Sequence, residues 1–220
     1  GADVALTGTA GATTAVVTGG GTTYNVAVSG MVASGTVIAT IPAGNAQDVA
    51  GNGNASSTST DNSVIFDFTA PSVTINQAAG QTDPTNTSPI VFDVIFSKPV
   101  TGFANTDVIL SGSAGATTAV VAGAGTTYTV TVSGMTLNGT VIASIPAGAV
   151  TDSVGNTNTV STSTDNTVTY DTVGPTVTIN QAAAQADPTG TSPINFTVVF
   201  SEPVTGFTDT DLNLGGTAGA

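Results

Sequence analysis

The sequence predicts an all-β protein made of tandem β-sandwich domains, with about seven strands in each repeat of 104 residues. The first observation is composition: Thr and Val, whose branched side chains favour strands, are abundant, and long helix-forming stretches are missing. The second is internal repetition, because GATTAVV occurs at 11–17 and 115–121, and VTINQAA at 73–79 and 177–183. The third is an alternation of apolar and polar side chains in short segments bounded by Gly, Asn and Pro.

The repeat sets the domain boundaries. Residues 1–104 match residues 105–208 at 68 of 104 positions, and a unit of that length suits a domain with its own core better than a solenoid coil. We place unit starts at Pro71 and Pro175, each of which follows an acidic, linker-like stretch. The predicted domains are the last five strands of a first repeat at 1–70, a complete repeat at 71–171, and the first three strands of a third repeat at 172–220. Because the chain starts at Gly1 within a repeat, we expect a processed product or a segment of a longer chain.

In the complete repeat, the alternation predicts seven strands. In order along the chain they are Ser72–Gln77, Pro89–Ser97, Asp107–Ser111, Thr117–Val121, Thr127–Ser133, Thr140–Ile145 and Asn166–Asp171. The side chains predicted to face inward are Val73, Ile75, Ile90, Phe92, Val94, Phe96, Val108, Leu110, Tyr128, Val130, Val132, Val141, Ala143, Ile145, Val168 and Tyr170. Gly123 and Gly125 are expected in the turn between the fourth and fifth strands, and Asn138-Gly139 indicates a hairpin turn before the sixth.

The second of these strands supports the assignment of faces. Its apolar residues at positions 90, 92, 94 and 96 recur unchanged 104 residues later, whereas Val91 and Asp93 become Asn195 and Thr197. Change between the copies therefore falls on the outer face, as a sheet with one buried face requires.

Charge and composition exclude several functions. The chain has 14 acidic residues, a single base, Lys98, and no His, Cys or Trp, for a formal net charge of −13. It therefore has no imidazole or thiol for catalysis, and too few cations to bind nucleic acid. No apolar run reaches the roughly 18 residues of a transmembrane helix, so we expect no membrane insertion. Because nothing is suited to activate a Ser or Thr hydroxyl, we also expect no enzyme activity.

Three segments carry a resemblance to a known family. They are FSEPVTGFTDTDLNL at 200–214, GTVIASIPAGAVTDSVGN at 139–156 and TYDTVGPTVTI at 169–179. They resemble the bacterial immunoglobulin-like repeats of giant secreted and surface proteins, and the resemblance covers the whole chain. It implies tandem immunoglobulin-like β-sandwiches in adhesin stalks, extracellular filaments or surface layers. It implies no enzyme activity, and it implies calcium between domains in some members.

Acidic residues recur at equivalent positions of the repeats, and some are candidate calcium ligands. In an immunoglobulin-like sandwich, the incoming linker and several loops share the end that faces the preceding domain. This placement would bring a linker acid, Asp67 or Asp171, near Asp152 and Asn156 of one loop and near Glu202 of another. Ca²⁺ takes roughly six to eight oxygen ligands, so these five residues are the predicted interdomain metal ligands and calcium is the predicted cofactor.

Two alternatives stay open for these acids. Each Asp could instead form a turn or cap a strand end, and no compact D-x-D-x-D-G loop is present. Lys98 stands where the next copy has Glu202, and an ammonium beside Asp67 and Asp152 would oppose a cation and could replace it by a salt bridge. We therefore expect the junction at Asp67 to be ion-paired or to bind calcium weakly, and the junction at Asp171 to be more competent for calcium.

The incomplete repeats at the two ends predict an assembly. Either end alone would leave an unpaired apolar edge, so we expect the partners to be copies of the chain or the continuation of the same array. Either the chain is a window on a long polypeptide or separate subunits exchange strands, and the 12-residue overlap between the two ends favours the first.

These observations predict a structural protein that is located outside the cell or on its surface. The predicted function is a segment of an extracellular filament or sheath, and the alternative is the stalk of a surface adhesin whose ligand-binding domain lies outside this window. Glycans on Asn, Ser or Thr are further candidate partners, with sequons at Asn54, Asn86, Asn138 and Asn195.

Overall fold

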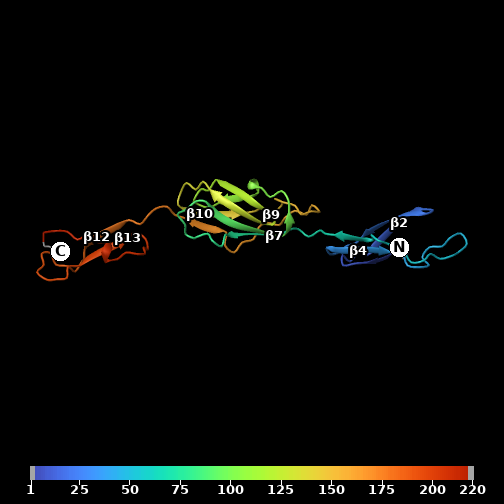
Figure 1. The fold of residues 1–220 in the computed structure, drawn as a ribbon, viewed down its shortest axis with the longest axis horizontal. Coiled ribbons are helices and arrows are strands. Elements are labelled where there is room, and N and C mark those ends of the chain that lie inside the picture. The colour runs from blue at the N-terminus through green and yellow to red at the C-terminus, as the bar shows by residue number, and fades with distance from the viewer. Residues whose placement is uncertain (1–2, 218–220) are drawn as a thin grey trace. The chain divides into compact units, whose positions relative to one another are not determined.

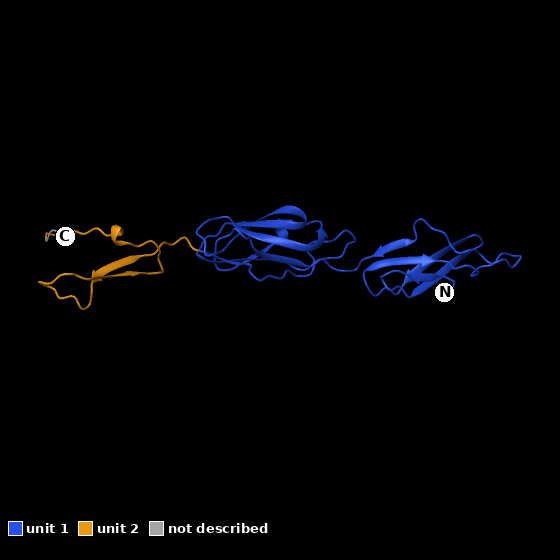
Figure 2. Cartoon of the chain, turned by 60° about the horizontal axis from the view of Figure 1, so that its bottom comes forward, with its two compact units in different colours: residues 1–170 blue, residues 171–220 orange. Residues whose placement is uncertain are grey.

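The computed structural model describes residues 3–217, so the outer ends of the first and third predicted repeats, 1–2 and 218–220, lie outside the described residues. Within residues 3–217 the regular structure is thirteen strands and two short 3-10 turns, which confirms the prediction of an all-β protein. The elements are β1 (Ala5–Thr7), β2 (Thr14–Gly20), β3 (Thr23–Ser29), β4 (Gly35–Thr40), β5 (Ser63–Phe66), β6 (Val73–Gln77), β7 (Ile90–Val100), η1 (Asn105–Asp107), β8 (Ile109–Ser111), β9 (Thr118–Ser133), β10 (Gly139–Ser144), β11 (Thr167–Tyr170), β12 (Val177–Gln181), β13 (Phe196–Phe200) and η2 (Asp209–Asp211). Contacts divide the chain into Gly1–Tyr170 and Asp171–Ala220 (Figure 2). In the described part of the chain, no helix is long and apolar enough to cross a membrane.

The complete repeat forms two three-stranded sheets, whose strands β7, β9 and β10 are labelled in Figure 1. The two sheets share one hydrophobic core. One sheet has the order β6-β7-β9 and the other β11-β10-β8, and all neighbouring strands are antiparallel. In the first sheet, Ile75 lies opposite Val94, and Phe92 lies opposite Val130. The buried apolar side chains of both sheets form a single cluster, because each strand turns alternate residues to the same side.

The predicted inward faces are confirmed. Every side chain expected inside is buried except Leu110 and Tyr170, which are half-buried and pack against the same cluster. The rings of Phe96, Phe103 and Tyr128 meet edge to face, with centroids 5.1 to 5.8 Å apart. This arrangement is the one that aromatic quadrupoles favour, and it closes the core at the end of β7.

The fourth and fifth predicted strands are joined into one continuous element, β9. The amide of Thr117 donates to the carbonyl oxygen of Ser133 at 3.2 Å, so the residue just before this element lies beside the last residue of the element. The chain reverses at Gly123 and Gly125, whose φ angles of 127° and 68° lie in the region that favours glycine. In the first repeat the same hairpin is divided into β2 and β3, which pair along their whole length.

The boundaries of two other strands differ from those predicted by more than one residue. The third predicted strand is shorter, because Asp107 ends the turn η1 and its Oδ2 accepts a hydrogen bond from the amide of Ala104 at 2.8 Å. Asp211 makes the same bond with the amide of Thr208 in the next copy, so this acid caps a turn in both. The second predicted strand is longer, since β7 continues beyond Ser97 with an irregularity in its pairing.

The first and third repeats contain only parts of this arrangement. The first has the sheets β1-β4-β5 and β2-β3, and the third has the hairpin β12-β13. The sequence VTINQ forms both β6 and β12. In β6, Val73 and Ile75 are buried, whereas all five residues of β12 are exposed, because the described part of the third repeat contains no second sheet to cover them.

Candidate functional site

Residues of the linker between the first and complete repeats come together around Lys98. Lys98 lies near the end of β7, Asp67 follows β5 directly, and Asp152 lies in the loop after β10. Lys98 Nζ lies 2.8 Å from Asp67 Oδ2 and 3.1 Å from Asp152 Oδ2, and it donates to the carbonyl oxygen of Thr69 at 2.6 Å. An ammonium group has three hydrogens to donate, and three oxygens receive them here. The chain's single base thus holds the linker against the complete repeat.

The linker is also bound to the first repeat. Asp67 Oδ1 accepts hydrogen bonds from the amide of Thr69 at 2.9 Å and from Ser34 Oγ at 3.0 Å. Ser34 Oγ in turn accepts a hydrogen bond from the amide of Phe68 at 3.1 Å. Because Ser34 lies just before β4, the Asp67 carboxylate connects the turn of one repeat to the lysine of the next.

The loop that holds Asp152 completes the site. Asp152 Oδ1 accepts hydrogen bonds from the amides of Val154 and Asn156 at 3.0 and 2.9 Å. Asn156 Nδ2 donates to Asp152 Oδ2 at 2.9 Å and to the carbonyl oxygen of Asp67 at 3.3 Å. Asp152 is only 5% exposed, and a carboxylate at such a position requires partners of this kind. We call Ser34, Asp67, Thr69, Lys98, Asp152 and Asn156 together the Lys98 junction.

The loop at Asp152 folds by local interactions, as its copy in the first repeat shows. Asp48 Oδ1 accepts hydrogen bonds from the amides of Ala50 and Asn52 at 2.9 and 2.8 Å, and Asn52 Nδ2 donates to Asp48 Oδ2 at 2.9 Å. The same three bonds therefore form in an exposed loop and in a buried one. The turn-forming role that the sequence left open holds for both acids. At Asp152 the second carboxylate oxygen serves the ion pair as well.

The charges of the site stabilise one another. Lys98, together with the amide of Thr69, holds the pKa of the Asp67 carboxyl below its ordinary value. Hydrogen bonding to Asp67 raises the pKa of the Lys98 ammonium, an effect that exceeds the opposing effect of burial. Burial alone would raise the pKa of Asp152, but hydrogen bonds from Asn156 and Lys98 outweigh it and hold that pKa well below its usual range. All three groups are therefore charged at neutral pH.

Three of the five predicted metal ligands, Asp67, Asp152 and Asn156, are brought together in this way. The carboxylates of Asp67 and Asp152 bind the Lys98 ammonium, and Asn156 donates to Asp152 and to the carbonyl oxygen of Asp67. The ammonium already supplies a positive charge between the two carboxylates, and calcium at these three residues stays a prediction. The junction at Asp67 is ion-paired, which is one of the two outcomes expected for it. Nowhere in residues 3–217 does a group of three acidic side chains form a candidate metal site.

The other two predicted ligands are Asp171, the last residue of the complete repeat, and Glu202 in the third repeat. Asp171 Oδ1 accepts a hydrogen bond from the amide of Val173 at 3.0 Å, much as Asp67 caps the amide of Thr69. Glu202 follows β13, at the position equivalent to Lys98. Calcium at these two residues stays a prediction.

Two members of the Lys98 junction carry no recognisable sequence signal. Ser34 stands where the next copy has Asn138, so repetition does not mark it. Thr69 binds Lys98 and Asp67 through its backbone carbonyl and amide, groups that nearly every residue possesses, and its hydroxyl contacts Ser34 Oγ at 2.6 Å. Only the folded chain shows that they belong to the site.

One of the predicted sequons has a structural role. Asn54 Nδ2 donates to the carbonyl oxygens of Pro42 at 3.0 Å and Ala55 at 2.7 Å, and Asn158, its counterpart in the complete repeat, is buried with the same pattern of bonds. The Asn54 side chain therefore braces a loop.

Comparisons of the chain with protein-family models, with curated proteins and with solved structures found no match.

Proposed function

We propose that the chain is a structural segment of a bacterial extracellular filament or sheath, made of tandem immunoglobulin-like domains that neighbouring copies complete and extend. In this proposal it has no enzyme activity, and its partners are further copies of the same repeat. The acidic, cysteine-free composition suits a role outside the cell that needs neither a reactive side chain nor a disulfide.

The strand order supports the immunoglobulin-like assignment. The first, second and fifth strands of the complete repeat are neighbours in one sheet, and the seventh, sixth and third are neighbours in the other. Immunoglobulin domains of the constant type pair their strands in this way, with the fourth strand beside the fifth. The reversal within β9 places the fourth strand there.

The Lys98 junction is the observation that carries the proposal. A linker between independent modules needs no fixed geometry, whereas an extended array transmits force only if its joints resist bending. Here Asp67 is bonded both to Ser34 of the first repeat and to Lys98 of the complete one. The ion pair is partly shielded from solvent, so salt weakens it less than it weakens an exposed pair.

The state of Lys98 supports a structural role for the chain's single base. Its three donors are all engaged, and its raised pKa opposes the loss of a proton that a catalytic base would require. The amine therefore serves as a fixed positive charge.

Electron microscopy of the native material tests this proposal. Antibodies raised against the 220-residue chain should label filaments or a sheath outside the cells, with pre-immune serum as the control. Label confined to the cell interior, or to dispersed single molecules, would contradict the proposal. Label on isolated rods that do not pack side by side would instead support the adhesin stalk.

A further inference from the structure

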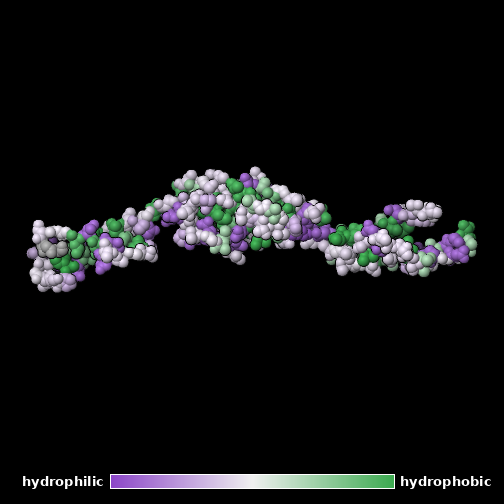
Figure 3. Space-filling view, in the orientation of Figure 1, coloured by the Kyte–Doolittle hydropathy of each residue, from purple (hydrophilic) through white to green (hydrophobic). Residues whose placement is uncertain are grey.

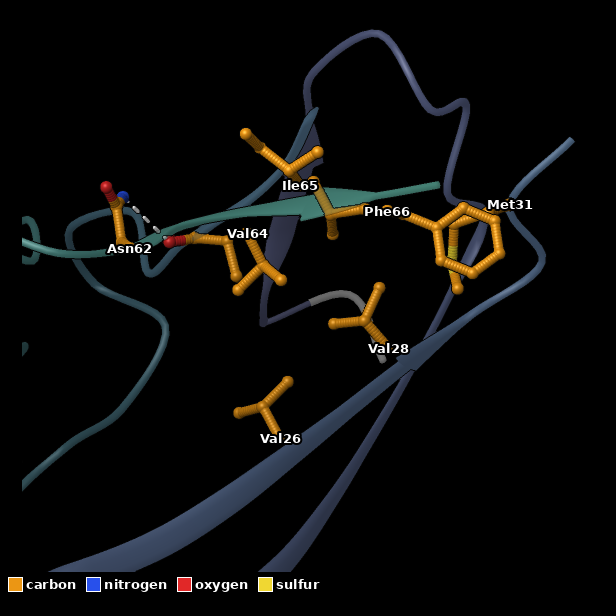
Figure 4. A pocket seen from close by; sticks show the side chains of 9 residues that line it. Val26, Val28, Met31, Asn62, Val64, Ile65 and Phe66 are labelled. Carbon is orange, nitrogen blue, oxygen red and sulfur yellow. Dashed lines mark hydrogen bonds between the residues drawn. The ribbon is translucent and has the colours of Figure 1, made fainter. Parts of the chain in front are cut away.

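The first repeat contains an open apolar groove. It has a volume of about 330 Å³ and lies between β3 on one side and β4 and β5 on the other. Figure 4 shows Val26 and Val28 on one wall and Val64 on the other, with their side chains directed into the space between. Among the described strands β3 pairs only with β2, so its opposite edge is open to a further strand.

The complete repeat shows what fills such a groove. Val26, Val28, Val37 and Val64 each stand 104 residues before a valine that is fully buried in the complete repeat. There, β6 and β7 cover these valines, and β7 pairs with the second half of β9, which is equivalent to β3. The groove therefore corresponds to the space that the hairpin β6-β7 occupies in the complete repeat.

The third repeat presents that hairpin without a cover. Val177, Ile179, Ile194 and Phe196 are between 55% and 59% exposed, whereas their counterparts in the complete repeat are at most 2% exposed. On the outer face the two copies do not differ: Val199 is 57% exposed and its counterpart Ile95 is 55% exposed. Hydrophobic surface is visible on both incomplete repeats (Figure 3). The unpaired face of β12-β13 is thus the face that a complete repeat buries.

We propose that the groove between β3 and β4-β5 binds the β12-β13 hairpin of a second copy of this chain. The register follows from the complete repeat, where Phe92 lies opposite Val130. Phe196 of the second copy should lie opposite Val26, with β13 added to the open edge of β3 by main-chain hydrogen bonds. This inference rests on the proposed function, in which neighbouring copies complete the repeats, and it names the segment, the groove and the register.

The overlap between the two ends of the chain does not obstruct this docking. β1 already pairs with β4, as β8 pairs with β10 in the complete repeat. The second copy therefore needs to supply only its first two strands. Its residues that follow η2, as far as residue 217, form no strand.

Paired cysteines test the register, because the chain has no cysteine of its own. Asp93 lies opposite Thr129 on the outer face, which predicts that Thr197 lies opposite Asn25 across the new contact. The double variant N25C/T197C should give a ladder of disulfide-linked multimers on a non-reducing gel after mild oxidation. The control T23C/N195C, four residues out of register, should stay unlinked. Equal ladders in both variants, unlinked chains in both, or a disulfide closed within one chain would overturn the proposal.

Charge substitutions test the groove and the hairpin separately. Val26→Asp and Phe196→Asp should each abolish the concentration-dependent association of the wild type in sedimentation velocity. Val16→Asp is the matched control, because Val16 is 53% exposed and its counterpart in the complete repeat is 48% exposed, so it should associate like the wild type. Association that survives both of the first two substitutions, or that Val16→Asp abolishes as well, would overturn the proposal.

Mixing the two charged variants removes the ambiguity of misfolding. The Val26→Asp chain keeps an intact hairpin and the Phe196→Asp chain keeps an intact groove, so the mixture should form dimers that cannot grow. A mixture that stays monomeric would overturn the proposal.

The outcomes also separate this inference from the proposed function. If the native material is filamentous but the chain stays monomeric in solution, docking of a second copy is wrong and a continuous array remains. If the chain associates in register but the native material is not filamentous, the docking stands and the proposed function is wrong.

Discussion

Ile75 and Ile179 allow the core to be tested within one molecule, because both stand in the middle of the strand sequence VTINQ. Ile75 is fully buried and faces Val94 across the β6-β7 pair, whereas Ile179 is 55% exposed. We expect Ile75→Val to lower the free energy of unfolding of the complete repeat by about 1 kcal/mol. Ile179→Val should change it by less than about 0.5 kcal/mol.

The magnitudes follow from burial. Removing one buried methylene group loses about 0.8 kcal/mol of transfer free energy, and the cavity that remains adds a few tenths. At Ile179, water already reaches more than half of the side chain, so at most about half of the transfer term is lost and no cavity remains. For a domain of about 100 residues, 1 kcal/mol corresponds to a decrease in Tm of about 4–8 °C.

Thermal unfolding followed by calorimetry measures both variants beside the wild type. The protein concentration should be low, so that association does not protect the hairpin that contains Ile179. A clear decrease for Ile75→Val with little change for Ile179→Val is the expected result. Equal decreases, or no decrease for Ile75→Val, would refute the assignment of a closed core to residues 71–170.

Three further predictions concern the Lys98 junction and the turns. Because the carboxyl pKa values of Asp67 and Asp152 are lowered by folding and the ammonium pKa of Lys98 is raised, the junction should stabilise the fold fully between about pH 4 and about pH 10. Its contribution is lost as the pH falls through the lowered carboxyl pKa values or rises through the raised ammonium pKa. The decrease in Tm at alkaline pH should therefore be smaller in Lys98→Met than in the wild type. An equal decrease in both would count against the ion pair. Lys98→Glu should lower Tm in calcium-free buffer. Calcium at about a hundredfold excess over its dissociation constant should then raise the free energy of unfolding of this variant by about 2.7 kcal/mol. An equal increase in the wild type would argue against the Lys98 ammonium as the cation of this site. Gly112 has a φ of 101°, and Gly112→Ala would place a Cβ against the backbone carbonyl of Thr140. It should therefore destabilise more than Gly148→Ala, where the space is open and only the backbone strain of φ 78°, about 1–2 kcal/mol, applies. Urea unfolding that ranks the two variants in the opposite order would disprove this.

The core could be predicted from the sequence because it depends on a local rule. Alternation along a strand assigns each residue to a face, and repetition supplies a second copy in which outward positions such as Asp93 change while inward positions such as Phe92 do not. The turn at Asp152 could also be anticipated, since the hydrogen bonds that form the turn itself reach no further than Asn156. Such features need only neighbours in sequence.

The rest of the site depends on contacts between distant residues. The pairing of Asp67 with Lys98 could be anticipated only by borrowing the geometry of a resembling family, and Ser34 could not be found in this way because its hydroxyl matters only once the linker has folded back on it. The sequence left calcium and an ion pair with Lys98 open at Asp67 and Asp152, and the structure has the ion pair there. The strands β6 and β12 have the same sequence but differ in burial, because, among the described residues, only β6 is covered by a second sheet. The sequence of the strand alone does not predict that difference.

Because Lys98 lies on β7 but outside the core, the residue at this position can change the junction between two repeats without changing the core. The segments FSKPV and FSEPV differ at this one residue, and they share the phenylalanine and valine that are buried in the complete repeat. A joint with lysine carries its own counter-charge and depends little on the ions in the medium. A joint with glutamate has to obtain a counter-charge from outside. An array that contained both kinds would stay firm at some joints and soften at others when the salt around it changed, without any alteration of the domains between them.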